Sequence, residues 1–314
     1  LILYLKYFIL IREWFKESQT NIPDYIDETI YHLGQSYAFF WVNSGLDLLF
    51  NGNNNSNNIE FDNYLKRFGY KFKNDNSDLG GYKVFRNKKI FFIIDTGSTP
   101  SSKFTKDYQS GSLSFEIISN GKKLISNCGY FKDSKNNLSQ ISKSTATHST
   151  LAIDDNSSCK FEKVNNSFLI KKGVKITNIS AIYEKNYWMI NASHDGYLKK
   201  YNSIHDRKIE FFPEQMKFIG TDKIIKKKTN HHYKFDIRFH VEPNVKLMKT
   251  QDNKTILIEL YDQGWKFTCN NYDINIDNGL YFGNKNLYIE NQNIYISGIS
   301  NNQIENIIWE ISKI

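Results

Sequence analysis

Apolar residues near the start of the chain recur every three or four positions, which is the period of an α-helix. One apolar stretch ends near residue 18, and a second follows Pro23, whose fixed φ suits the first turn of a helix. The second stretch places apolar residues at Ile26, Ile30, Leu33, Tyr37 and Phe40. We therefore predict that residues 1–50 form two helices in an α-hairpin, followed by a polar loop at 51–58 and a short helix near 60–68.

From residue 82 the pattern changes to short runs of alternating apolar and polar residues, which turn residues separate. One turn is expected at Asn87–Lys88, and Asn120–Gly121 stands between two runs, which is the strongest short signal of a β-hairpin. Roughly fifteen or more such runs predict a large antiparallel β-sandwich. We therefore predict a helical domain at residues 1–70 and one mainly-β sandwich domain at residues 71–314.

The composition of the 314 residues is that of a folded protein, with 40% hydrophobic and 24% charged residues. Aromatic residues make up 15%, which suits strands, and exposed aromatic rings can also stack on sugars. The net charge of +8 favours an anionic partner, although a composition rich in Lys, Asn and Ile explains the charge equally well. No basic helix, zinc-finger spacing or RNP-like strand is present, so we expect no nucleic-acid partner.

The first eleven residues are apolar except for Lys6, but they are too few to span a membrane. They also lack the basic start and the cleavage site of a signal peptide. We expect them to be a buried helix from a longer chain, with no transmembrane segment.

Three widely spaced cysteines, Cys128, Cys159 and Cys269, form neither a disulfide framework nor a zinc motif. A single disulfide stays open, so the cysteines do not fix the compartment.

Histidines supply the first candidates for chemistry. His32 is expected to be structural, and His231 and His232 follow three lysines in what reads as a solvated basic loop. His194 lies in a polar stretch with other candidate side chains, namely Tyr197, Tyr201, His205 and Arg207. Such a group could hold a carboxylate and transfer a proton. The alternative is a strand pair whose polar residues lie on its wet face. No nucleophile-elbow, zinc-protease or phosphate-loop motif is present, and a carboxylate pair for glycoside hydrolysis stays open.

Five strings together resemble the heparinase II/III-like family over nearly all of residues 82–314. In chain order they are LSFEIISNGKKLISNCG, ATHSTLAID, SHDGYLKKYNSIHDRKIEFFP, IRFHVEPNV and GWKFTC. The resemblance implies a β-sandwich that follows the end of an α/α toroid, and β-elimination of an acidic, glycosaminoglycan-like polysaccharide. The strings are most similar to the version in proteobacterial cell-envelope proteins, which implies the cell envelope or periplasm.

The resemblance can be carried over residue by residue. His148, in the string HSTL, matches a histidine that binds zinc in some members, while the other two zinc ligands fall on Gln109 and Asn127. A catalytic histidine of the family falls on Asp107. Neutral amides are poor zinc ligands. The resemblance therefore implies a degenerate zinc site at His148, Gln109 and Asn127, or a hydrogen-bonded trio in its place, and no other cofactor.

Two functions follow from these expectations. The first is a polysaccharide lyase in which the toroid supplies most catalytic groups, with His148, His194 and Tyr197 as catalytic residues of the sandwich. His205, Arg207 and Tyr201 would then bind the substrate. The second is a non-catalytic carbohydrate-binding or envelope-assembly protein on the same scaffold, which the replaced zinc ligands favour. The oligomeric state and the particular polysaccharide stay open.

Overall fold

The computed structural model describes residues 1–42, 45–54, 58–133, 136–164, 167–227, 231–283 and 287–314. The chain divides into two compact units. The helical unit comprises residues 1–47 and 56–79, and the β unit comprises residues 48–55 and 80–314. The β unit therefore starts later than the predicted boundary at residue 71, and it also takes in a short segment that we expected to belong to the helices.

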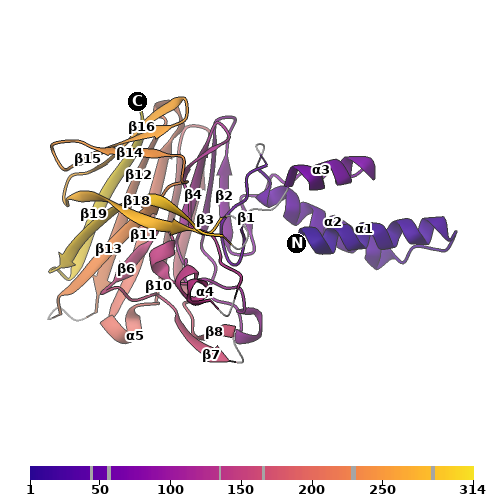
Figure 1. Cartoon of the computed structure of the whole chain (residues 1–314), viewed down its shortest axis with the longest axis horizontal. Helices are drawn as coiled ribbons and strands as arrows, with labels where there is room; N and C mark the ends of the chain where they lie inside the picture. The colour runs from indigo at the N-terminus through magenta and orange to yellow at the C-terminus, as the bar shows by residue number, and fades with distance from the viewer. Residues whose placement is uncertain (43–44, 55–57, 134–135, 165–166, 228–230, 284–286) are drawn as a thin grey trace. The chain divides into compact units, whose positions relative to one another are not determined.

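The helical unit contains α1 (Ile2–Glu17), α2 (Asp24–Phe40) and α3 (Asn58–Arg67), as Figure 1 shows. Leu5 and Ile9 of α1 share a buried cluster with Ile26 and Ile30 of α2, which is the core that the apolar spacing predicted. The prediction that helix continues to residue 50 is wrong, because the chain becomes extended at Trp41. The polar loop predicted at 51–58 lies partly outside the described residues. Among the described residues, no helix is long and apolar enough to cross a membrane.

Strands dominate the remainder of the chain. Their bounds are β1 (Asp78–Leu79), β2 (Tyr82–Arg86), β3 (Ile90–Asp95), β4 (Phe115–Ser119), β5 (Lys122–Ile125), β6 (Leu151–Ile153), β7 (Lys160–Val164), β8 (Ser167–Lys172), β9 (Ile176–Tyr183), β10 (Trp188–His194), β11 (Ser203–Phe212), β12 (Lys217–Lys226), β13 (Tyr233–His240), β14 (Lys246–Lys249), β15 (Thr255–Leu260), β16 (Gln263–Cys269), β17 (Ile274–Tyr281), β18 (Ile289–Ser300) and β19 (Ile304–Lys313). Short helices interrupt them, namely η1 (Ser102–Phe104), α4 (Asn137–Ser142), η2 (Thr145–Thr147), α5 (Leu198–Tyr201) and η3 (Pro213–Gln215).

The β unit is a large antiparallel sandwich, so the predicted fold class is confirmed (Figure 1). One sheet has eight strands in the order β14-β15-β16-β19-β12-β11-β10-β9. A second has the order β17-β18-β13-β6, β2 to β5 follow one another in a third, and β7 and β8 form a hairpin. The predicted turn at Asn120–Gly121 joins β4 to β5, and both residues have positive φ, 46° and 76°.

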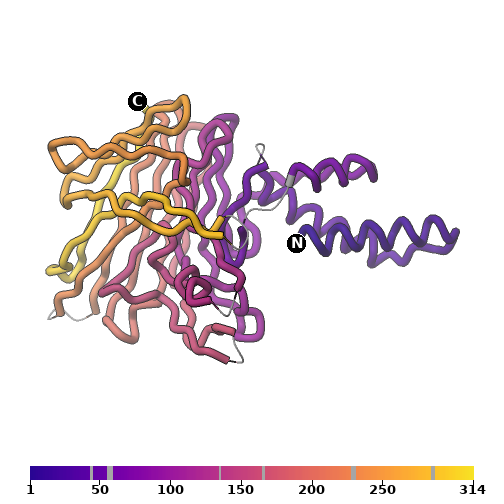
Figure 2. The backbone as a smooth tube through the Cα atoms, viewed as in Figure 1, coloured from indigo at the N-terminus to yellow at the C-terminus, as the bar shows by residue number. Residues whose placement is uncertain are grey.

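The C-terminal strand β19 lies inside the eight-stranded sheet, between β12 and β16 (Figure 2). On one side of it, β9 to β12 follow one another as a meander, and on the other side β14 to β16 do the same. The hydrogen bonds that β19 makes with β12 and with β16 therefore join the two meanders into one sheet.

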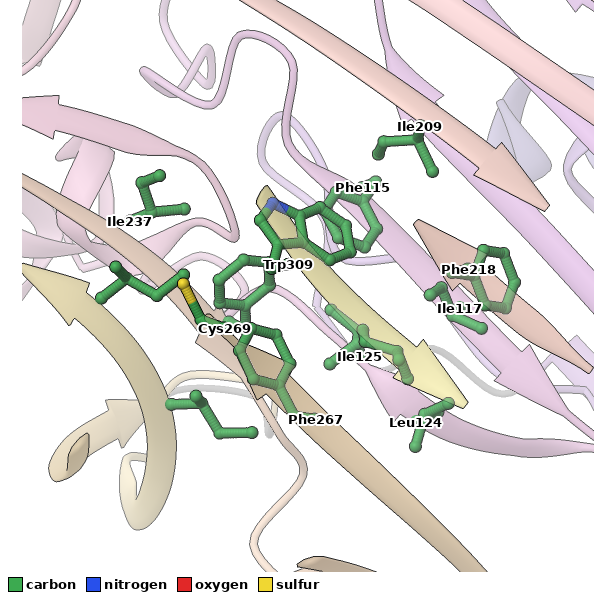
Figure 3. Packing of buried hydrophobic residues seen from close by; sticks show 14 of the residues in the cluster. Phe115, Ile117, Leu124, Ile125, Ile209, Phe218, Ile237, Phe267, Cys269 and Trp309 are labelled. Carbon is green, nitrogen blue, oxygen red and sulfur yellow. The ribbon is translucent and has the colours of Figure 1, made fainter. Parts of the chain in front are cut away.

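The core of the β unit lies between the eight-stranded sheet and the smaller sheets (Figure 3). Trp309 of β19 stacks on Phe115 of β4, with 5.7 Å between ring centroids, and meets Phe239 of β13 edge-on at 4.9 Å. Burial of a large apolar side chain contributes roughly 2–3 kcal/mol to folding. The three cysteines are buried and free. Apolar packing, without disulfide bonds among these cysteines, therefore holds the sheets together.

We expect Gly220→Ala to destabilise the β unit by about 2–3 kcal/mol, as overpacking of a core does. A Cβ atom at Gly220 would lie 2.0 Å from the indole ring of Trp309, directly across from it on β19. The indole has little freedom to move, because it stacks on Phe115 and its Nε1 donates a hydrogen bond to Asp222.

Urea unfolding followed by tryptophan fluorescence would measure this change. Gly264→Ala on β16 is the matched control, because the nearest atom to its new Cβ would be 3.7 Å away, at ordinary contact distance. The control should change the unfolding free energy by less than about 0.5 kcal/mol. Equal effects of the two substitutions would contradict the packing argument.

Candidate functional site

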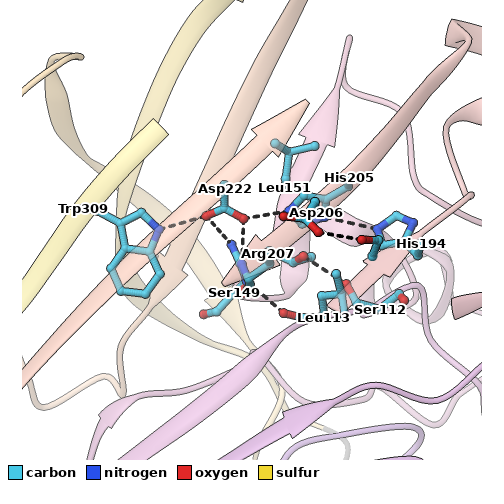
Figure 4. A network of polar contacts seen from close by, with 12 residues as sticks. Ser112, Leu113, Ser149, Leu151, His194, His205, Asp206, Arg207, Asp222 and Trp309 are labelled. Atoms are coloured by element: carbon cyan, nitrogen blue, oxygen red, sulfur yellow. Dashed lines mark hydrogen bonds and ion pairs between the residues drawn. The ribbon is translucent and has the colours of Figure 1, made fainter. Parts of the chain in front are cut away.

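A network of buried polar side chains crosses the middle of the eight-stranded sheet (Figure 4). The strand register places His194 of β10 opposite His205 of β11, and Arg207 of β11 opposite Asp222 of β12. The guanidinium of Arg207 binds both carboxylate oxygens of Asp222, with Nε–Oδ1 at 2.7 Å and Nη2–Oδ2 at 3.0 Å. The same carboxylate also accepts hydrogen bonds from His205 and from the indole of Trp309.

The hydrogen bonds determine which ring nitrogen of His194 and of His205 carries the proton. The amide of Gly196 donates to Nδ1 of His194, so that nitrogen is an acceptor and the proton lies on Nε2. This Nε2 then donates to Nδ1 of His205 at 3.2 Å, and Nε2 of His205 donates to Asp222 at 2.6 Å. Burial lowers the pKa of both histidines, so both rings stay neutral. Burial alone would raise the pKa of Asp222, but Arg207 and His205 hold it well below its ordinary value.

The structure brings the predicted residues of this region together, but inside the protein. His194, Tyr197, His205 and Arg207 are each at most 1% exposed, and Tyr201 is 4% exposed. Nη1 of Arg207 donates to the carbonyls of Leu113 and Ser149, and Tyr197 donates to the carbonyl of Leu151. The alternative of a wet strand face is therefore wrong, and contact of these side chains with a polymer would require the core to open.

The residues of the predicted zinc site do not fit a metal ion. Nε2 of Gln109 donates to the carbonyls of Gly129 and Ser142, and its Oε1 accepts from the amide of Gly52. Oδ1 of Asn127 accepts from the amide of Ser149 at 2.9 Å. Both amide oxygens are thus used by the backbone. Across the described residues, no group of three His, Cys, Asp or Glu side chains could hold a metal.

The alternative of a hydrogen-bonded trio is also wrong. Nδ1 of His148 donates to the carbonyl of Ser144 at 2.8 Å, while its Nε2 and Nδ2 of Asn127 are buried without a hydrogen-bond partner among the described residues. Burial lowers the pKa of His148 to about 4, so the ring is neutral and its Nε2 carries a lone pair. His148 keeps the chemistry of a ligand, but Gln109 and Asn127 supply none.

An open pocket lies within the β unit, and its lining includes Asp107 and Tyr108, which directly precede Gln109 in the chain. Its volume is about 370 Å³, and the long connection from β3 to β4 forms much of its wall. Lys103, Lys106 and Asp107 line it and are exposed, whereas Asp95, at the end of β3, is only 3% exposed. The segment that contributes the two lysines leads directly into Asp107 and Gln109, the positions that the family resemblance singles out.

Lys103, Lys106 and Asp95, which line this pocket, were not among the residues predicted from the sequence. A signal was available, because a polar stretch of some twenty residues separates two fully buried strands at this point. A long connection between strands of a compact domain is commonly a functional loop.

Comparisons with known proteins agree on the fold. The model of the heparinase II/III-like C-terminal domain matches residues 73–310. The heparan sulfate lyase HepC from Pedobacter heparinus superposes with a TM-score of 0.76 at 13% identity, covering 99% of this chain and 51% of that chain. A heparinase III superposes with a TM-score of 0.72 at 15% identity, covering 99% of this chain and 53% of that chain.

The chain thus spans about half the length of these solved structures. No curated protein matches it by sequence. The family model covers well over half of the chain and includes every residue that lines the pocket except Asn51. By this match, the chain belongs to the heparinase II/III-like family and contains its C-terminal domain.

Proposed function

We propose that the protein is a polysaccharide lyase that acts on a uronate-containing polymer at the pocket lined by Lys103 and Lys106. The observation that carries this proposal is the position of the two lysines. They lie on the segment that ends in Asp107 and Gln109, where the family resemblance implies catalytic and metal-binding histidines. Two exposed ammonium groups on one short segment suit an acidic polymer, which agrees with the net charge of +8.

The reaction explains why cations are needed. In β-elimination, a base removes the proton on the carbon next to the carboxylate, and the electron pair forms a carbon–carbon double bond. The bond from the adjacent carbon to the glycosidic oxygen then breaks, and that oxygen takes a proton from an acid. Charge builds up on the uronate carboxylate in the transition state, so nearby cations stabilise it. The base and acid would come from toroid helices, as the resemblance implies, because His148, His194 and Tyr197 are buried.

The helical unit supports its assignment as the end of an α/α toroid. Beyond the face that packs on α2, α1 carries a second apolar stripe in which Leu3, Tyr7 and Trp14 are 58%, 53% and 61% exposed. Further helices would cover such a stripe in a toroid. Because acidic polysaccharides of this kind are exported polymers, the proposal also places the protein in the cell envelope or periplasm.

The proposal predicts that the protein releases unsaturated uronate ends from at least one acidic polymer, which an increase in ultraviolet absorbance would detect. Lys103→Ala with Lys106→Ala should lower kcat/KM about tenfold at low ionic strength, and the difference should shrink as salt screens the charges. The matched control is Lys246→Ala with Lys249→Ala on β14, which removes the same charge from two exposed positions elsewhere. Equal losses in both double variants would contradict a specific role of the pocket.

A second candidate function is binding of the polymer without cleavage. The amide oxygens of Gln109 and Asn127 are used by the backbone, and this observation favours it. Titration of a uronate oligosaccharide with the folded protein would then show binding that weakens with salt, and no absorbance change. Absence of both binding and cleavage with every acidic polymer would exclude the two functions together.

A further inference from the structure

The lysine-lined pocket has an acidic residue inside it. Asp95 lines the pocket and is 3% exposed, while its neighbours on the rim are open to solvent. Its Oδ1 accepts a hydrogen bond from the amide of Gly97 at 3.0 Å, and its Oδ2 accepts one from Nδ2 of Asn51 at 3.1 Å. A carboxylate has about four acceptor positions, so these two bonds leave capacity for further donors.

The chemistry around Asp95 favours a donor from a ligand. Burial raises the pKa of Asp95 to about 6, although the bonds from Gly97 and Asn51 act in the opposite direction. The carboxylate is therefore still ionised at neutral pH but poorly solvated, and such a group gains most from a new hydrogen bond. Tyr82 and Tyr108 also line the pocket.

The rim carries two cations beside one carboxylate, that of Asp107. Lys103 and Lys106 are exposed there, and Phe104 beside them is 69% exposed, with Nζ of Lys103 lying 4.9 Å from the centre of its ring. A ligand that enters this pocket thus meets cations at the mouth and a hydrogen-bond acceptor deeper inside. A sugar with hydroxyl donors on one edge and an acidic group on the other complements both.

We propose that Asp95 accepts hydrogen bonds from unsubstituted hydroxyl groups of one sugar unit, while the acidic group of the polymer contacts Lys103 and Lys106. This inference rests on the proposed function and adds a specificity to it. A sulfate group or an alkyl group in place of those hydroxyls would leave Asp95 without a donor, and a sulfate would also be repelled by its charge. The preferred polymer is therefore acidic through its carboxylates, with free hydroxyl groups on the unit that enters the pocket.

A pair of ligands tests this without any change to the protein. The probes are a uronate oligosaccharide and the same oligosaccharide with its hydroxyl groups methylated and its carboxylates intact. Calorimetric titration of the wild-type protein should give at least tenfold weaker binding of the methylated probe. Equal affinity for the two probes would overturn the role of Asp95 but leave the proposed function standing. If neither probe binds and no acidic polymer is bound or cleaved, both proposals fail.

Asp95→Asn provides the second test. We expect this variant to bind the unmodified probe at least tenfold more weakly and to lose most of the discrimination against the methylated one. The variant of Lys103 and Lys106 should instead weaken binding of both probes to a similar extent and keep the discrimination. Asp262→Asn, an exposed carboxylate between β15 and β16, is the matched control and should behave as wild type. Full discrimination in a folded Asp95→Asn variant would overturn the inference.

Discussion

Replacing Asp222 by asparagine is expected to cost about 3–5 kcal/mol of unfolding free energy, which is the usual effect of removing one partner from a buried ion pair. The carboxylate is fully buried and accepts hydrogen bonds from Arg207, His205 and Trp309. Asparagine has nearly the same shape, but it leaves the Arg207 cation without a counterion in the core. Its amide group would also face donors, because every contact of Asp222 in this network is with an N–H group.

Urea unfolding followed by tryptophan fluorescence is suited to this measurement, since Trp309 is itself part of the network. Asp206→Asn on β11 is the matched control. Asp206 is also buried, but the partner of its Oδ2 is the hydroxyl of Ser193, at 2.6 Å, rather than a cation. The control should lose about 1 kcal/mol, the typical net value of one hydrogen bond. A loss below 1 kcal/mol for Asp222→Asn would show that Arg207 finds other compensation.

Lowering the pH from 7 to 5 is expected to remove about 3 kcal/mol or more of stability from the β unit. Four histidines are buried and neutral in the folded protein. Burial lowers the pKa of His148 to about 4 and that of His240 to about 3, and it acts in the same direction on His194 and His205. The unfolded chain takes up these protons near pH 6.5, whereas the folded protein does so only at lower pH.

This difference in proton binding determines whether the free energy of unfolding rises or falls with pH. Below about pH 6.5 the unfolded state binds more protons than the folded state, so stability falls as the pH falls. His148 and His240 each contribute about 2 kcal/mol to this loss at pH 5, and His194 and His205 act in the same direction. Burial raises the pKa of Asp95 to about 6 and also raises that of Glu242. These two carboxyl groups take up protons more readily in the folded state, so they offset part of the loss.

Denaturant unfolding at several pH values between 5 and 7 would measure the effect. His148→Gln should reduce the number of protons taken up on unfolding in this pH range by about one. A free energy of unfolding that stays constant over this pH range would contradict the prediction. It would mean that the pKa values of the buried histidines are the same in the folded and unfolded states.

The sequence predicted the helices and strands well where the apolar period was regular. Ile26 and Ile30 correctly indicated the buried face of α2, and Asn120–Gly121 correctly indicated the hairpin of β4 and β5. The end of α2 was missed, because the residues that follow it are also apolar. Their burial depends on contacts distant in sequence, such as the bond from the amide of Leu49 to Glu116.

The candidate site was predicted less well. His205 and Arg207 alternate along β11 with the same period as Ile209 and Phe211, so the sequence already indicated that these polar side chains share the buried face. Both hypotheses for this region, a substrate site and a wet strand face, required these side chains to be exposed, whereas charged residues can be buried where they have partners. Their partner Asp222 comes from the next strand, and no local pattern pairs them. The pocket was missed for a similar reason, since tertiary folding brings Asn51 to Asp95 across more than forty residues.

The position of β19 has a consequence for how the protein is made. A ribosome releases β9 to β12 and then β14 to β16, and each group can form hairpins as it emerges. Neither group can join the other until Ile304–Lys313 has been synthesised, because that strand lies between β12 and β16. Until then the nascent chain exposes two unpaired strand edges beside apolar residues, which is a state prone to aggregation. Completion of the sheet thus waits for the synthesis of β19, and termination before residue 304 would leave two separate half-sheets rather than a slightly shorter domain.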